Sequence, residues 1–164
     1  MRIVPATPAD APLILDMIKG LADYEKLSHA VVATEEQIRD TLFGAKPAAE
    51  VLLAESNGEW VGFALFFPTY STFLAQPGLY LEDLYVKPHA RGKGFGKALL
   101  TELAKIAVAR GYGRMEWVVL DWNAPSIDFY KKLGAVAMNE WTTYRLTGTE
   151  LLRLADPNTS TSAP

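Results

Sequence analysis

Two short stretches of the sequence combine residue types that could do chemistry. The first reads VKPHARGKGFGKALL over residues 86–100, and its central residues are Gly92, Lys93, Gly94, Phe95, Gly96 and Lys97. Glycines let backbone N–H groups turn toward a ligand, and the N-terminus of a following helix adds partial positive charge. This glycine turn, residues 91–97, predicts an anion site, and a flexible strand-to-helix connection is the structural alternative.

The spacing within the glycine turn excludes two familiar phosphate sites. A dinucleotide-binding fingerprint needs a third glycine where Lys97 stands. A Walker A loop needs Gly-Lys-Ser or Gly-Lys-Thr, which is absent from the sequence.

The second stretch, LYLEDLYV at residues 79–86, places two carboxylates inside an apolar run. Adjacent residues of a strand point to opposite faces, so at least one of Glu82 and Asp83 is expected on the covered side of the sheet. A carboxylate there could orient a cation or accept a proton. A hydrogen bond to a loop, or a position at the sheet edge, is the structural alternative.

The elements that must position these residues follow from periodicity and turn signals. A strand over residues 2–4 is followed by a helix that starts at Thr7 and runs to about Leu27, and a capping box at Thr34 opens a second helix. Strands are expected over 51–55, 60–67 and 79–86, with an Asn-Gly hairpin after the first and a loop over 68–78. A helix over 96–110, a buried parallel strand over 115–120, a helix over 126–133 and a strand over 140–146 complete the order.

This order predicts the α/β class, a central mixed sheet with helices on both faces. The chain has 164 residues, of which 49% are hydrophobic, so one domain over residues 1–154 is expected, with residues 155–164 as a disordered tail.

Composition limits the partners. The net charge of −3 gives no basic field for nucleic acid, and no apolar run approaches a membrane span, so neither partner is expected and the location is predicted to be cytoplasmic. The absence of cysteine excludes thiolate sites, and two histidines are too few for an ordinary zinc site, so no metal is expected.

The order Arg91-x-x-Gly94-x-Gly96 after a strand resembles the pyrophosphate-binding motif of the GNAT superfamily of N-acetyltransferases. The segments LYLEDLYV, RGKGFGKALL and DWNAPSIDFYKKLGA are similar to segments of the diamine (spermidine/spermine) and thialysine N-acetyltransferases, as are LADYEKL and VGFALFF near the start. The likeness covers about residues 2–146, and it implies a GNAT-like fold and acetyl-CoA as co-substrate.

The resemblance implies which residues would hold acetyl-CoA. The backbone of Leu84, Tyr85 and Val86 would contact the pantetheine arm, and the glycine turn from Arg91 onward would enclose the pyrophosphate. The other wall would consist of Asn123, Ala124, Pro125 and Ser126. Turn chemistry is the alternative role of Asn123.

Acetyl transfer to an amine requires two proton transfers. The incoming ammonium, with a pKa of about 10.4, must lose a proton, and the departing thiolate needs one, which a phenol can donate. Tyr130 in DFYKKLG matches the general-acid tyrosine of the family, and Ile127 and Leu133 are expected to share its inward face; core packing is the alternative. The resemblance implies substrate binding and proton relay by Glu82, with Asp83 in support.

The resemblance also implies further substrate-binding positions. These are Tyr24, Glu25, Glu116, Trp117, Val118 and Glu140. Glu25 could equally be a solvated helix residue. Around Glu140 the sequence MNEWTTYRL is shorter and less acidic than in the family member compared, which favours a shorter amine such as a lysine analogue over a polyamine.

The predicted function is transfer of an acetyl group from acetyl-CoA directly to the primary amine of a small cationic acceptor, either a diamine or polyamine or a lysine analogue such as thialysine. A covalent acetyl-enzyme is not expected, because there is no cysteine and no GxSxG serine. The alternatives are a catalytically silent CoA-binding module and an acetyltransferase that acts on protein amines. A protein acceptor would need an open groove, and an aromatic lid over residues 67–73 would argue against it. The resemblance implies a homodimer.

Overall fold

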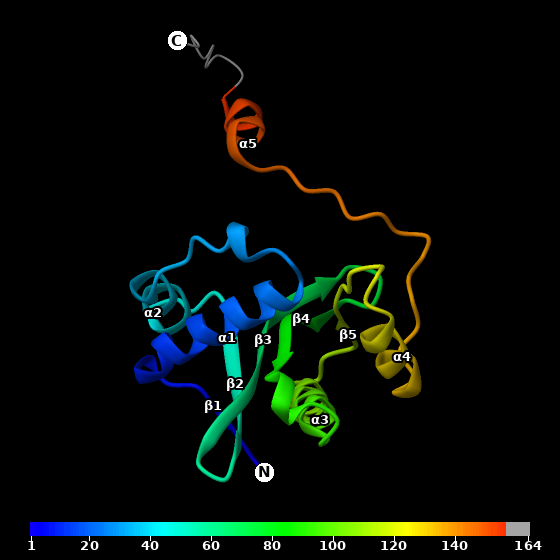
Figure 1. Ribbon diagram of the computed structural model, residues 1–164. Helices are drawn as coiled ribbons and strands as arrows, with labels where there is room; N and C mark the ends of the chain where they lie inside the picture. The colour runs from blue at the N-terminus through cyan, green and yellow to red at the C-terminus, as the bar shows by residue number, and fades with distance from the viewer. Residues whose placement is uncertain (157–164) are drawn as a thin grey trace. The chain divides into compact units, whose positions relative to one another are not determined.

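The computed structural model describes residues 1–156. The chain forms two units, residues 1–118 and residues 119 onward, and each is described by itself (Figure 1). The expectation of one domain over residues 1–154 stays a prediction. The tail predicted to be disordered lies outside the described residues from residue 157 onward.

The first unit is built on a five-stranded mixed sheet in the order β1-β2-β3-β4-β5. Neighbouring strands run antiparallel except β4 and β5, which are parallel. The strands are β1 Arg2–Pro5, β2 Glu50–Ser56, β3 Glu59–Ser71, β4 Gln76–Val86 and β5 Met115–Glu116. Asn57 and Gly58 join β2 to β3 with φ values of 52° and 82°, as a two-residue hairpin turn with positive φ at both positions requires.

One predicted loop is a hairpin instead. Strands β3 and β4 pair as far as Ser71 with Gln76, so the loop expected over residues 68–78 is wrong. The lid role of residues 67–73 stays a prediction. Pro68 and Gly78 are turn signals in isolation, but backbone pairing between the two strands of the hairpin overrides them. A side chain at Gly78 would lie 2.8 Å from Thr69 Oγ1, which explains why glycine occupies this position inside a strand.

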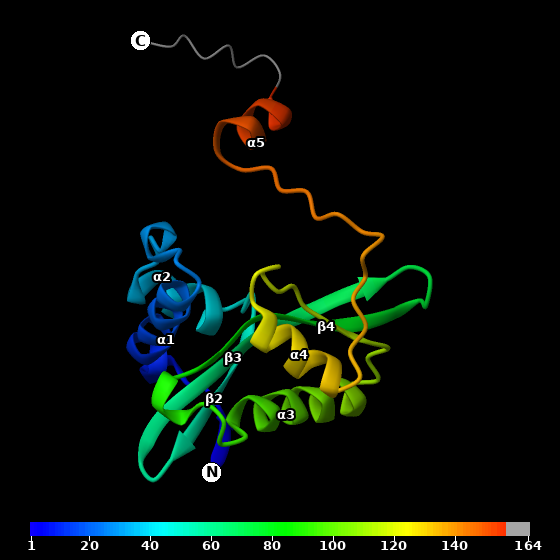
Figure 2. The ribbon, with the colours of Figure 1, turned by 45° about the vertical axis from the view of Figure 1, so that its right-hand side comes forward.

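Helices cover both faces of the sheet (Figure 2). On one face lie α1, Ala11–Tyr24, and α2, Glu35–Phe43, and on the other lies α3, Phe95–Ala109. Short 3-10 turns η1 Pro8–Asp10, η2 Ser28–Ala30 and η3 Pro88–Ala90 connect them. Because neither face meets water, residues 51–54 of β2 and 61–64 of β3 are buried without alternation.

The helix ends agree with the sequence to within a few residues. The first helix begins after η1 and ends at Tyr24. Two residues later, Lys26 adopts a left-handed φ of 62°. The capping box of Thr34 is formed, because its side chain accepts from the Gln37 N–H at 3.2 Å. Helix α3 begins one residue before the expected Gly96.

The second unit differs most from expectation. Its helices are α4 Ala124–Lys132 and α5 Gly148–Ala155, and residues 141–147 between them form no strand. The strand predicted over 140–146 is wrong, because within residues 1–156 no strand pairs with it. The strand predicted over 115–120 shortens to β5. No helix in residues 1–156 combines the length and apolarity needed to cross a bilayer.

Candidate functional site

A β-bulge in β4 determines how the two adjacent carboxylates are presented. Asp83 pairs with Leu65, but the next pair is Leu81 with Phe66, so Glu82 is the extra residue. Alternation from Tyr85, which packs in the core beneath α1, places Asp83 on the α1 face. Asp83 is half-buried and Glu82 is exposed. The expected buried carboxylate is therefore Asp83.

Charge and burial change the chemistry of Asp83. Its pKa is raised from 3.8 to about 6, chiefly because burial removes the carboxylate from water, and further because of the negative charges of Glu82 and Glu25. Burial also raises the pKa of Glu25. We call Glu25, Glu82 and Asp83 the acidic cluster. Such a cluster favours a bound cation, since a positive charge relieves the repulsion.

The acidic cluster does not have metal-site geometry. Among residues 1–156, no three His, Cys, Asp or Glu side chains are arranged to hold a metal ion. An organic ammonium needs no such convergence, because it is satisfied by one or two carboxylates and by hydrogen bonds.

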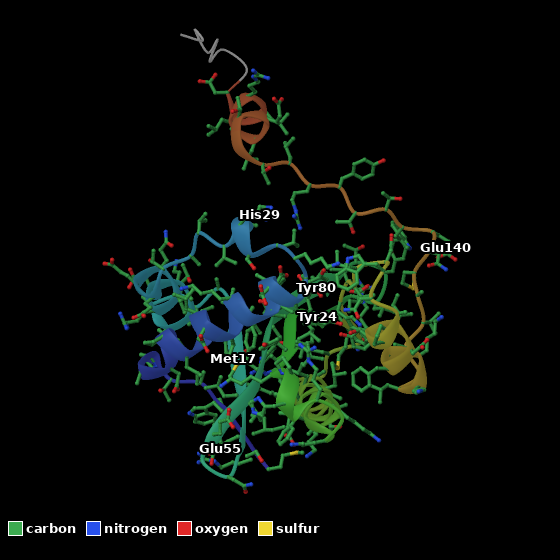
Figure 3. The ribbon with its side chains drawn as sticks, viewed as in Figure 1. Met17, Tyr24, His29, Glu55, Tyr80 and Glu140 are labelled. Carbon is green, nitrogen blue, oxygen red and sulfur yellow. The ribbon has the colours of Figure 1, made fainter. Side chains whose placement is uncertain are left out.

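The end of α1 places Tyr24 beside β4 (Figure 3), and Glu25, the next residue, lies near enough to Asp83 of β4 for its charge to act on that carboxyl group. The Leu27 N–H donates to the Ala22 carbonyl at 2.8 Å and the Lys26 N–H to the Asp23 carbonyl at 3.1 Å, the pattern of a helix C-cap with a left-handed residue. This cap fixes the direction in which Glu25 leaves the helix.

The outer edge of β4 is open beyond Tyr80. Strand β5 pairs only with Leu79 and Tyr80, and within residues 1–156 no strand pairs with the later part of this edge. The Lys87 N–H donates to the Val61 carbonyl at 2.8 Å, so by alternation the backbone of Tyr85 points toward β3.

The same alternation directs the backbone groups of Leu84 and Val86 toward the open edge. The Val86 carbonyl already accepts from Arg91 Nε at 2.9 Å. The Leu84 groups and the Val86 N–H are thus placed to meet an extended ligand lying along the strand.

The glycine turn leads from β4 and η3 into α3. Gly92 and Gly94 have φ values of 74° and 88°, in the left-handed region that favours glycine. The Ala98 N–H donates to the Gly94 carbonyl, which closes the first turn of α3, so the preceding N–H groups have no partner inside the helix. These groups are those of Phe95, Gly96 and Lys97, and they form the positive end of α3.

The side chains of the glycine turn are not equivalent. Phe95 is 5% exposed and belongs to the core, so only its backbone can meet a ligand. Gly96 lies inside α3, whereas Lys93 and Lys97 are exposed. The turn therefore offers an anion backbone N–H groups and two lysine charges.

Other predicted site residues of the first unit lie around β5. Glu116 Oε2 forms an ion pair with Arg114 Nε at 2.7 Å, Trp117 is half-buried, and Val118 is 65% exposed. The pairing of Glu116 was not anticipated, although Arg114, two residues before it and just ahead of β5, was an available signal.

The second unit carries the remaining predicted residues. Asn123 is 5% exposed, and its Oδ1 accepts from the Ser126 N–H at 3.3 Å, so it caps α4 ahead of Ala124 and Pro125. Tyr130 on α4 is half-buried, with its ring 5.4 Å from that of Phe129.

Leu133 and Glu140 are both exposed in this unit. Ile127 is half-buried like Tyr130, but Leu133 is 40% exposed, so the predicted inward face does not include Leu133, which stands beyond the last helical residue. Glu140 is exposed on the irregular segment after α4 (Figure 3).

Comparison with known proteins identifies the family. Residues 18–135 match the acetyltransferase (GNAT) family. The chain is 39% identical to a thialysine N-epsilon-acetyltransferase of Sus scrofa, over 92% of this chain and 94% of the relative. It is 38% identical to an L-ornithine N5-acetyltransferase of Arabidopsis thaliana, over 92% of this chain and 86% of the relative.

A solved structure shows the same fold. The integron cassette protein from the mobile metagenome of V. cholerae superposes with a TM-score of 0.80 at 26% identity, over 94% of this chain and 97% of that one. The predicted α/β class and the predicted GNAT resemblance, with its thialysine branch, are confirmed. The chain belongs to the GNAT family of acetyltransferases and is an N-acetyltransferase.

Proposed function

We propose that the protein transfers the acetyl group of acetyl-CoA to one amine of a small acceptor that carries a second cationic group. The acidic cluster beside the β4 bulge carries this proposal, because two of its carboxylates are desolvated and all three would gain from a neighbouring ammonium. Ornithine and thialysine, named for the two relatives, each carry two amino groups, which supports the same acceptor class.

The first unit offers a track for acetyl-CoA. The outward backbone groups of Leu84 and Val86 would pair with the pantetheine arm, and the glycine turn would receive the pyrophosphate. The donor set fits an elongated molecule with amide groups at one end and phosphates at the other. The roles of Asn123, Ala124, Pro125 and Ser126 as a second wall stay a prediction.

Two proton steps would be served by different groups. Asp83, desolvated on the α1 face, would accept the proton of the incoming ammonium, with exposed Glu82 binding the ammonium and exchanging protons with water. The Tyr130 hydroxyl would then protonate the CoA thiolate as the C–S bond breaks. The amine nitrogen attacks the thioester carbon directly, the C–S bond breaks, and the remaining extra proton of the nitrogen would return through water to the Tyr130 phenolate. The acetyl group thus moves in one complex of three partners.

The acceptor class can be tested with matched amines. We expect CoA release from acetyl-CoA with thialysine, L-ornithine and 1,5-diaminopentane, with kcat/KM for the diamine about tenfold or more above that of pentylamine. The second ammonium makes a charge-assisted contact worth about 1.5–3 kcal/mol. Spermidine and a basic peptide complete the panel. Equal kcat/KM for diamine and monoamine, or preference for the peptide, would contradict the proposal and favour a protein amine as acceptor.

The anion site can be tested at Gly94. We expect Gly94→Ala to weaken acetyl-CoA binding about tenfold, because a φ of 88° costs alanine about 1–2 kcal/mol and relaxation would turn the helix N-terminus away. A new Cβ meets no atom within 4 Å, so crowding is not the cause. The measurement is calorimetric titration with acetyl-CoA.

Gly58→Ala is the matched control for this test. Gly58 has a φ of 82° and equally open surroundings, but it lies in the β2–β3 hairpin. The Gly58→Ala variant should lose about as much stability as Gly94→Ala and should keep the wild-type affinity for acetyl-CoA. An unchanged dissociation constant in Gly94→Ala would remove the glycine turn from the binding site.

Three further expectations stay proposals. Exposed apolar side chains in the second unit, among them Val136, Trp141 and Tyr144, support a homodimer. A cytoplasmic location and the substrate contacts of Trp117, Val118 and Glu140 stay predictions. A silent CoA-binding module is the second candidate, and turnover with any amine in the panel would exclude it.

A further inference from the structure

Arg91 contacts three residues of two elements, β4 and α1, at the point where the two proposed substrate sites meet. Its Nε donates to the Val86 carbonyl at 2.9 Å, at the end of β4. Its guanidinium carbon lies 4.4 Å from the ring centre of Tyr24, at the end of α1, and 5.7 Å from that of Tyr85. Arg91 itself is the first residue of the glycine turn. One side chain thus connects this turn with the end of α1.

Of the two rings beneath Arg91, that of Tyr85 is held by close packing, whereas Tyr24 is only half-buried at the end of α1. Tyr85 is 8% exposed and packs among core residues of α1. A Cβ at Gly20 would lie 2.7 Å from the Tyr85 hydroxyl oxygen, so glycine there allows the phenol to fit against the helix. A stacked guanidinium adds about 0.5–2 kcal/mol per favourable ring contact. The Tyr85 ring therefore gives the guanidinium one fixed support.

The chemistry of arginine is specific in this position. A planar guanidinium can donate through Nε to a carbonyl and still lie flat on an aromatic ring, leaving its terminal N–H groups for an anion. A lysine ammonium is a compact charge that cannot meet both contacts at once.

The contact between Arg91 and Tyr24 affects the acceptor site because a single peptide bond links Tyr24 to Glu25. Tyr24 immediately precedes Glu25, whose charge contributes to the raised pKa of Asp83. A shift of Tyr24 would move Glu25 relative to Asp83. The placement of the acidic cluster therefore depends on the ring that Arg91 covers.

We propose that Arg91 is a positioning residue that couples the two substrate sites by holding Tyr24, and with it Glu25, against the end of β4. This inference rests on the proposed function. An anion in the glycine turn would immobilise the terminal N–H groups of Arg91, and the ordered guanidinium would in turn order the end of α1. The amine then binds more tightly to the CoA complex than to the free protein, and by linkage CoA binds more tightly in the presence of amine by the same factor.

The test measures this coupling with CoA and thialysine as probes. Thialysine is titrated by calorimetry into the free protein and into the CoA-saturated protein, and the reverse pair of titrations checks reciprocity. We expect wild type to show about a fivefold or larger coupling factor. Arg91→Lys and Tyr24→Leu should each reduce it below about twofold, and the double variant should lose no more than either single one.

Two further variants separate positioning from general damage. Tyr24→Phe keeps the ring and should keep the coupling. Arg2→Lys weakens a comparable stack, in which the guanidinium carbon lies 5.6 Å from the Trp60 ring centre on β3, and should also keep it. Loss of coupling in Tyr24→Phe, or its retention in Arg91→Lys, would overturn the role of Arg91.

The outcomes distinguish this role from the proposed function. Wild type that acetylates thialysine but binds it equally well with and without CoA overturns the coupling alone. Wild type that binds CoA but not thialysine contradicts both the acceptor class and the coupling.

Discussion

Tyr130→Phe should lower kcat for amine acetylation by about a hundredfold or more and leave the KM for acetyl-CoA nearly unchanged. A positioned general acid contributes about 10²–10⁴ to rate, and here the departing thiolate would lose its proton donor. The aromatic ring and its packing beside Phe129 are retained in the variant, so binding and folding should be preserved. The measurement is steady-state CoA release with the best amine of the panel.

Tyr144→Phe is the matched control. Tyr144 is 92% exposed on the irregular segment of the second unit, and removal of its hydroxyl should leave kcat unchanged. If Tyr130→Phe retained more than half of the wild-type kcat, the phenol would have no part in the proton transfer, and the thiolate would have to leave unprotonated or be protonated by water.

Asp83→Asn should stabilise the protein at pH 7.5 while it lowers activity. The folded-state pKa of Asp83 is about 6 against an ordinary value of 3.8, so the fold disfavours the ionised form. The folded state therefore binds more protons than the unfolded state between about pH 4 and pH 6, and the free energy of unfolding falls as the pH rises through this window. Above pH 6 the folded state bears the full free-energy cost of ionising Asp83. Asparagine carries no charge and removes this cost, which is about 2–3 kcal/mol.

Urea unfolding at two pH values tests the stability half of this prediction. Asp83→Asn should be more stable than wild type at pH 7.5, and the difference should be nearly gone at pH 4, where the wild-type carboxyl is protonated in the fold. Asp16→Asn on the exposed side of α1 is the control and should change stability by less than about 0.5 kcal/mol. Equal differences at both pH values would show that ionisation of Asp83 is not the cause.

The pH profile tests the activity half. If Asp83 accepts the proton, wild-type kcat/KM rises with pH through an apparent pKa near 6, since this parameter reports the free enzyme. Asp83→Asn should lower kcat/KM and abolish that limb, while the rise caused by substrate ammonium titration at higher pH remains in both proteins. A limb near pH 6 that persists in Asp83→Asn would assign it to another group.

Local signals predicted most of the first unit. The Asn57-Gly58 turn, the capping box at Thr34 and the apolar runs in β2 and β3 each depend on a few neighbouring residues, and each formed as expected. The outer part of the β3–β4 hairpin was missed because Pro68 and Gly78 look like strand breakers, and the pairing that overrides them is not visible in either strand's own sequence.

Near the end of the chain the error is the opposite one, a strand that was predicted and does not form. Residues 140–146 have strand composition, but a strand forms only with a partner, and none pairs with them within residues 1–156. Helix α5 had a readable signal, Thr147 followed three residues later by Glu150 and an apolar pair, the pattern of a helix start.

The candidate site was predictable by residue type but not by geometry. The glycine turn and the Glu82–Asp83 pair stood out as chemical anomalies. Which carboxylate is desolvated depends on a one-residue bulge, and a bulge follows from the register of two strands rather than from either sequence. The contact of Arg91 with Tyr24 joins residues far apart in the chain, and nothing local indicates it.

The most direct test is to incubate the protein with acetyl-CoA and thialysine and to identify the products by mass spectrometry, with a parallel reaction lacking the amine. The proposed function predicts stoichiometric N-acetylthialysine and free CoA in the complete reaction only. Hydrolysis of acetyl-CoA at the same rate without an acceptor, or no CoA release with any amine of the panel despite tight acetyl-CoA binding, would contradict it.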